Sequence, residues 1–155
     1  MSLNATLHRL LCCVALCAAF SGAAAPALAA AAKGDFPGPV EAHVLRIIDG
    51  DTLVAEATIW PGHVVTATIR LRGIDAPETR AACEEERRTA ARAREALSAL
   101  VGTGPVRISN ISAGKYYGRV LADVETADGR GLTGEMLARR LVRPYAGGRR
   151  QPWCE

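Results

Sequence analysis

Three short β-strand patterns follow one another in the first half of the chain, and the turns between them are short. The first pattern alternates apolar and polar residues and runs into the Asp49–Gly50 pair, a strong signal for a hairpin turn. The Pro61–Gly62 pair predicts the second turn. The predicted strands span residues 43–48, 53–59 and 64–71. Three strands joined by tight turns predict an antiparallel meander.

After residue 83 the sequence changes from strand patterns to a helix pattern. Residues 84–100 contain no Gly or Pro and are rich in residues that favour helices. The glutamates at 84–86 complement the positive end of the helix dipole. Five apolar residues at helical spacing are expected to form the buried face: Ala90, Ala93, Leu97, Leu100 and Val101.

Two more strands and a second helix complete the predicted domain. The strands span residues 106–111 and 120–126, and the helix spans residues 132–141. The helix residues expected to face inward are Leu132, Met136, Leu137 and Leu141. Five short strands, an inserted helix and a C-terminal helix predict an α+β, mainly β fold. The expected architecture is a five-stranded OB-fold barrel around one core.

The first thirty residues have the pattern of a secretory signal peptide. A basic start at His8–Arg9 precedes the apolar residues 10–20, and Ala27–Leu28–Ala29 fits a signal-peptidase site. The apolar run is shorter than the roughly 20 residues of a spanning helix, so we expect cleavage rather than a retained membrane anchor. The protein is then secreted or periplasmic, without stable membrane insertion. The predicted parts are a signal peptide (1–30), a linker (31–40), the domain (41–147) and a tail (148–155).

Charge and cysteine content restrict the partners and the compartment. The formal net charge of +3 does not by itself indicate a nucleic-acid partner. Without the leader, the remaining cysteines are Cys83 and Cys154, and an even pair in an exported domain predicts a disulfide that ties back the tail. Such a bridge closes a loop of about 70 residues and adds about 4 kcal/mol of stability. The alternative is two unrelated thiols.

Several short segments carry residues suited to the cleavage of a phosphodiester bond. The segments Asp49–Thr52 and Asp75–Glu78 supply two carboxylates for a hard metal ion and one candidate base. Arg70 and Arg119 supply guanidinium groups for a phosphate. Each segment alone is also compatible with an ordinary turn, because aspartates often bind backbone N–H groups there. The argument therefore depends on the ordered set.

That ordered set resembles the staphylococcal nuclease (thermonuclease) family. The resemblance extends from about His43 to Tyr145. Its motifs are the Asp–Gly–Asp–Thr turn, the spacing from Arg70 to Asp75 with Pro–Glu following, the Tyr–Gly–Arg119 triplet and the late Leu–Val–Arg–Pro–Tyr segment. The resemblance implies an OB-fold, Ca²⁺-dependent hydrolysis of DNA and RNA, and products that end in a 3′-phosphate.

By resemblance, the metal ligands are the carboxylates of Asp51 and Asp75 and the backbone carbonyl of Ala76. Hard oxygen donors of this kind suit Ca²⁺. Glu78 stands at the position of the general base that activates the attacking water. Arg70 and Arg119 would bind the phosphate and stabilise the charge of the five-coordinate transition state.

Three other positions are related to this site. Arg72 shares a strand face with Arg70, so it is an alternative phosphate ligand, although the spacing to Asp75 selects Arg70. Tyr117 corresponds to a residue that touches the nucleotide phosphate, and Tyr145 lies near where the family stacks bases. A role in the core or at a hinge is the alternative for either tyrosine.

One segment departs from the family pattern. The lysine-rich loop expected after the Pro–Glu step is replaced by residues 79–83, which carry only Arg80 as a charge. A Cys83–Cys154 bridge would tie the tail beside this loop. We hypothesise that the bridge fixes Glu78 in place of the missing loop.

The sequence therefore predicts a monomeric, exported, Ca²⁺-dependent endonuclease that acts on DNA and RNA. One alternative is a catalytically silent nucleic-acid-binding OB module, because OB-folds bind single strands without chemistry. The set of paired carboxylates, glutamate and two arginines argues against it, since a simple binding domain does not need carboxylates near phosphate. A second alternative is a structural or protein-interaction domain held by its disulfide.

Overall fold

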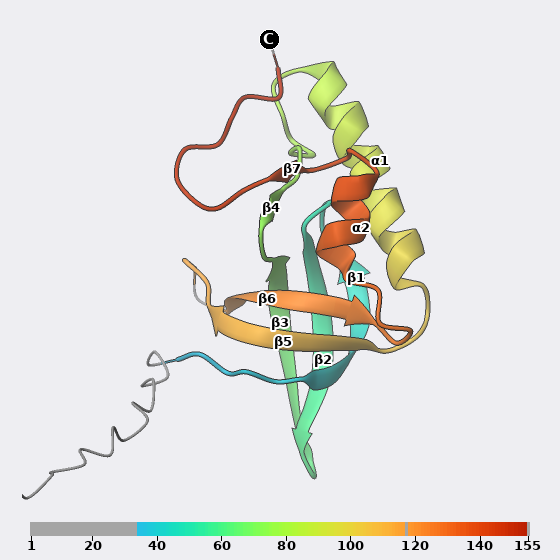
Figure 1. Ribbon diagram of the computed structural model, residues 1–155, viewed down its shortest axis with the longest axis vertical. Helices are drawn as coiled ribbons and strands as arrows, with labels where there is room; N and C mark the ends of the chain where they lie inside the picture. Colours follow the sequence, from blue (N-terminus) through green and yellow to red (C-terminus); the bar gives the residue numbers. More distant parts are fainter. Residues whose placement is uncertain (1–33, 117, 155) are drawn as a thin grey trace, which may run out of the picture. The chain divides into compact units, whose positions relative to one another are not determined.

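The computed structural model describes residues 34–116 and 118–154 (Figure 1). The predicted signal peptide and the first residues of the predicted linker lie outside the described residues, and so does Tyr117. Within the described part of the chain, no helix combines the length and apolar character needed to cross a membrane.

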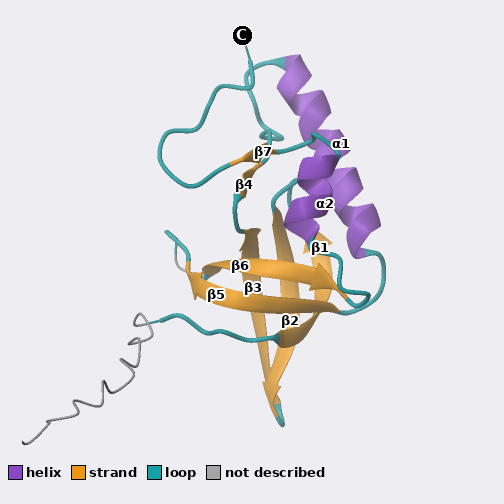
Figure 2. Cartoon of the chain, viewed as in Figure 1, coloured by secondary structure: helices purple, strands orange, loops and turns teal. Residues whose placement is uncertain are grey.

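The barrel begins with the predicted meander. β1 (Val40–Ile47), β2 (Thr52–Trp60) and β3 (His63–Leu71) are antiparallel neighbours. β6 (Arg119–Thr126) then pairs in parallel with β3 and antiparallel with β5 (Val106–Ala113), and β5 closes on β1. The order β1-β2-β3-β6-β5 forms a closed barrel, drawn in orange in Figure 2. This five-stranded mixed barrel confirms the predicted fold class.

Helix α1 (Glu84–Val101) covers one end of the core, and its buried face is the predicted one. All five predicted residues are buried, because apolar side chains at helical spacing share one face. All of them except Ala90 belong to the same core cluster as barrel residues such as Leu53, Ile69 and Val106, which are almost fully inaccessible to solvent. The first turn of α1 carries the three glutamates, as expected from the helix dipole.

Helix α2 (Leu132–Ala138) is shorter than predicted, and this part of the prediction was wrong. The helix ends before Leu141 because Arg140 adopts a left-handed backbone conformation with a φ of 56°. Its amide donates to the carbonyl of Leu137 at 2.9 Å, which closes the last turn tightly. Of the residues expected to face inward, Leu132 and Met136 are buried, whereas Leu137 and Leu141 are only partly buried.

Two pairings outside the barrel were not predicted. β4 (Ile74–Asp75) pairs with β7 (Arg143–Pro144), which places Asp75 opposite Arg143. Phe36, in the segment expected to be a linker, exchanges backbone hydrogen bonds with Ile111. The β4–β7 pair matters most for the site, because it holds one predicted metal ligand beside the start of the tail.

The tail returns to the start of α1 and is joined there by the predicted disulfide. Cys83 and Cys154 are bonded, and their Cα atoms are 6.0 Å apart. Figure 1 shows the tail, in red, looping out beyond β7 and coming back to the N-terminal end of α1. The expectation of a bridge is confirmed.

Candidate functional site

The turn between β1 and β2 fixes the first predicted metal ligand. The amide of Asp51 donates to Oδ1 of Asp49 at 3.0 Å, and Thr52 Oγ1 donates to Oδ1 of Asp51 at 2.7 Å. Asp51 is only 2% exposed. Burial and the nearby Asp51 carboxylate raise the pKa of Asp49 from 3.8 to about 6. Through the hydrogen bond from the Asp51 amide, Asp49 orients the turn.

Arg70 connects this turn to β4. Its partner across the β2–β3 ladder is Thr52, so its side chain lies next to Asp51. The guanidinium group donates to Asp51 Oδ1, to the Ile74 carbonyl at 3.2 Å and to Asp75 Oδ1 at 3.3 Å. One arginine therefore contacts both predicted carboxylate ligands and partly balances their charge.

Arg72 is directed to a different part of the barrel. It donates to the carbonyls of Asn110 and Leu121, at 2.5 and 3.1 Å, and to Ser112 Oγ at 3.0 Å. Its Nε lies 3.5 Å from Asp123. The structure therefore brings Arg70, rather than Arg72, into contact with Asp51 and Asp75.

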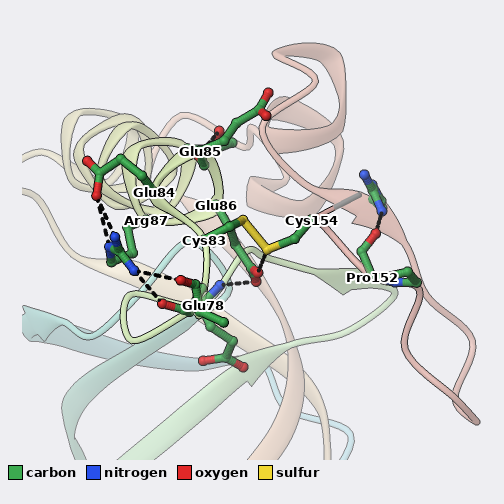
Figure 3. The surroundings of a disulfide bond; sticks show 12 residues. Glu78, Cys83, Glu84, Glu85, Glu86, Arg87, Pro152 and Cys154 are labelled. Carbon is green, nitrogen blue, oxygen red and sulfur yellow. Dashed lines mark hydrogen bonds and ion pairs between the residues drawn. A yellow bond between two sulfur atoms is a disulfide. The ribbon is translucent and has the colours of Figure 1, made fainter.

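The segment after β3 carries the second carboxylate and the candidate base. The Ala76 amide donates to Asp51 Oδ2 at 2.8 Å, which joins the two predicted metal-binding segments. Asp75 is 5% exposed, whereas Glu78 is exposed. The Glu78 amide donates to Glu86 Oε1 at 3.0 Å, so the first turn of α1 orients the backbone that carries the base (Figure 3).

A cleft of about 1020 Å³ collects most of the predicted site residues. Its charged lining residues are Arg70, Arg72, Asp75, Glu78, Lys115, Arg119 and Arg150. Arg119 is placed there because β6 begins beside Thr68 of β3, in parallel register. Within residues 34–116 and 118–154, no ion pair is found for Arg119. Its guanidinium group is thus suited to an incoming anion.

The cleft is lined by two of the described tyrosines, Tyr116 and Tyr145. Tyr145 lines the cleft, and its hydroxyl donates to the Gly148 carbonyl at 2.7 Å. Tyr117 lies outside the described residues, so its predicted role is not addressed by the structure. Tyr116, which was not predicted, lines the same cleft and is 62% exposed. An exposed aromatic ring at the cleft is a platform on which a base can stack.

Arg150 is the residue that sequence reasoning missed. Its guanidinium group contacts the Asp75 carboxylate, the Ala76 carbonyl and the Glu78 carboxylate. Partial burial opposes its charge, but hydrogen bonds and charge interactions with Asp75 and Glu78 outweigh burial and raise the pKa of Arg150. The signal was indirect: the disulfide from Cys83 to Cys154 brings the tail, and with it Arg150, beside Glu78.

The donor set fits a hard cation. Oxygens of Asp75, Ala76 and Glu78 converge on the guanidinium group of Arg150. Arg70 bonds both Asp51 and Asp75, and so links Asp51 to this set. Carboxylate and carbonyl oxygens are the ligands that Ca²⁺ takes, in flexible geometry. The cluster of Cys83, Glu86 and Cys154 does not offer an alternative metal site, because both sulfur atoms belong to the disulfide.

Comparison with known proteins agrees with this geometry. The model of the family described as staphylococcal nuclease homologue matches residues 68–147, just over half of the 155-residue chain. The match includes Arg70, Asp75, Glu78 and Arg119, whereas Asp51 precedes it. No curated protein matches the chain. With its barrel, its two helices and this match, the chain belongs to the staphylococcal nuclease homologue family.

Proposed function

We propose that this domain is a Ca²⁺-dependent endonuclease that hydrolyses DNA and RNA and leaves 3′-phosphate ends. Membership of the family suggests a nuclease. The observation that carries the proposal is the cleft in which Arg70, Asp75, Glu78 and Arg119 meet from separate elements. A site built to bind phosphate without chemistry has no need of carboxylates, because they repel the anion.

The proposed metal ligands are the carboxylates of Asp51 and Asp75 and the carbonyl of Ala76. Support comes from their chemistry, because carboxylate and carbonyl oxygens suit Ca²⁺. When bound, Ca²⁺ supplies positive charge to the phosphate oxygens and to a coordinated water. Asp51 is buried and fixed by Arg70 and the Ala76 amide, so it orients the ligand set. Asp75 lines the cleft, and its carboxylate contacts Arg70 and Arg150.

Glu78 is proposed to accept a proton from the attacking water. Its exposed carboxylate lies at the cleft, where a water and a phosphate can reach it. Attack forms a bond from the water oxygen to phosphorus and breaks the bond from phosphorus to the 5′ oxygen. The 5′ oxygen leaves and takes up a proton, and the phosphate stays on the 3′ side.

Arg70 and Arg119 are proposed to stabilise the additional negative charge of the five-coordinate transition state. Arg70 is oriented by two carboxylates and a carbonyl, so little freedom is lost when the phosphate binds. Arg119 approaches from β6, on the other side of β3 from Asp51. Planar guanidinium groups bind phosphate oxygens in pairs, which a lysine cannot do.

Export to the periplasm or the medium is part of the proposal. A disulfide persists in oxidising compartments and is rare in the cytosol, so the Cys83–Cys154 bridge supports this location. The signal peptide expected at residues 1–30 remains a prediction.

The test is cleavage of a fluorescent single-stranded DNA by the purified protein, with Ca²⁺ and with excess chelator. Glu78→Gln and Arg119→Ala should each lower the rate by about 100-fold or more, as losses of a base or of a charge stabiliser do. Arg149→Gln serves as a control on the tail. Salt-sensitive binding without cleavage would support the silent OB module instead.

A further inference from the structure

One guanidinium group lies among the oxygens proposed to hold the metal and to activate the water. Nε of Arg150 is 2.8 Å from Asp75 Oδ1, and the second terminal nitrogen donates to the Ala76 carbonyl at 2.8 Å. The other terminal nitrogen is 2.5 Å from Glu78 Oε1. Each side of the planar group thus faces one member of the proposed site. This is the contact pattern of a cation that fills a set of converging oxygens.

The tail that carries Arg150 is held at several points. Arg143, in β7, donates to the Pro152 carbonyl at 2.9 Å, and its guanidinium carbon lies 3.9 Å from the centre of the Trp153 ring. Trp153 Nε1 donates to Asp75 Oδ2 at 3.4 Å. The next residue is bonded to Cys83, at the N-terminal end of α1 (Figure 3).

These attachments make the contact of Arg150 an intramolecular one. The disulfide closes the tail over β4, so the guanidinium group stays near the carboxylates even when it dissociates briefly. A tethered group of this kind acts at a high effective concentration, commonly in the millimolar range. An external cation must therefore displace it.

We propose that Arg150 is an internal competitor for the cation, and that it lowers the calcium affinity of the proposed site. The inference rests on the proposed function, because it takes Asp75 and Ala76 as ligands of the metal and Glu78 as the base beside them. Ca²⁺ binds oxygen at about 2.3–2.6 Å, so an ion among these oxygens would coincide with the guanidinium group and be repelled by its charge. Arg150 and Ca²⁺ exclude each other.

The contact between Arg150 and Glu78 also restrains Glu78, the proposed base. While Glu78 is paired with Arg150, its carboxylate accepts a hydrogen bond that a water would otherwise make. Displacement of Arg150 by calcium therefore frees Glu78 at the moment when the metal site fills. Metal binding and base availability are coupled through one side chain, in the sense of a population shift between two arrangements.

The experiment measures the Ca²⁺ affinity of the purified protein by titration calorimetry. No nucleic acid is present, so the result does not depend on cleavage activity. Arg150→Gln should bind Ca²⁺ roughly tenfold more tightly, as expected from the loss of charge-assisted hydrogen bonds to the competing group. Arg149→Gln is the matched control: it removes the same charge from the neighbouring position, and no ion pair of Arg149 is found among the described residues. Its affinity should equal that of the unmodified protein.

A second measurement uses the disulfide. Reduction should tighten Ca²⁺ binding of the unmodified protein, because the tail is released, but should leave the affinity of Arg150→Gln unchanged. If Arg150 only held the tail in place, reduction would change the Ca²⁺ affinity of the two proteins in the same way. Equal or weaker affinity in Arg150→Gln, with Ca²⁺-dependent cleavage intact, would overturn the inference and leave the proposed function standing. Absence of both calcium binding and cleavage in every variant would overturn both.

Discussion

Gly50 is the position at which the turn that carries Asp51 is pressed most closely against helix α1. A Cβ atom at residue 50 would lie 2.6 Å from Ala93 Cβ and 3.0 Å from Ala76 Cβ. Both neighbours are buried, and a Cβ atom cannot rotate away from its backbone. The backbone of Gly50 is outside the left-handed region, so any cost of Gly50→Ala is steric rather than conformational.

The size of this cost follows from the distances. Carbon atoms pack best at about 3.5–4.0 Å, so a methyl group at residue 50 overlaps Ala93 by about 1 Å and the turn or the helix must move. Overpacking of a close-packed core costs about 1–3 kcal/mol, and we expect about 2 kcal/mol for Gly50→Ala. For a domain of this size the melting temperature should fall by about 5–10 °C.

The assay is urea unfolding, in a double-mutant cycle with Ala93→Gly. Ala93→Gly alone should destabilise by about 1 kcal/mol, because glycine weakens the interior of a helix. In the double variant the closest contact is absent, so the two costs should fall short of additive by at least about 1 kcal/mol. Gly134→Ala is the control, because no atom lies within 4 Å of the added methyl group, and it should stabilise α2. Additive costs, or a neutral Gly50→Ala, would refute the steric argument.

Two further predictions concern charge and the disulfide. The pKa of Asp49 is raised from 3.8 to about 6, so its ionisation opposes folding progressively between these two values. Asp49→Asn should therefore gain about 1–2 kcal/mol at pH 7 and almost nothing at about pH 3, where the carboxyl group is neutral in both states. Urea titrations at the two pH values check this, and equal gains would contradict it. Replacement of Cys83 and Cys154 by serine should cost about 4 kcal/mol, because the bridge spans a sequence separation of 71 residues. A loss below 1 kcal/mol in urea unfolding would show that other contacts already hold the tail in the unbridged protein.

The elements that could be predicted from the sequence are those with a local pattern. The meander and α1 have turn residues or apolar residues at regular spacing, and the structure confirms both. β4 and β7 have two residues each, and their pairing depends on how distant segments pack. The apolar spacing that predicted a helix to Leu141 is present, but the left-handed Arg140 ends the helix first.

The residues of the candidate site also fall into two groups, those with a local sequence pattern and those placed by distant contacts. The Asp51 turn and the Arg70-to-Asp75 spacing are local, and the structure does bring these three side chains together. Arg150 has no such pattern, because an arginine in a Gly-rich tail looks like any solvated charge. Its position results from the closure of the tail by Cys83 and Cys154. Only the three-dimensional path of the chain shows which oxygens it meets.

Asp51 and Asp75 differ in what their substitution can reveal. The oxygens of Asp51 accept from Thr52, Arg70 and the Ala76 amide, and the side chain is buried, so Asp51 holds the turn, β3 and the segment after β4 together. Its removal leaves buried donors unpaired and is expected to destabilise the fold. Lost cleavage in an Asp51 variant would therefore not separate metal binding from structure. Asp75 contacts the tail residue Arg150, so Asp75→Asn tests the proposed metal site more directly.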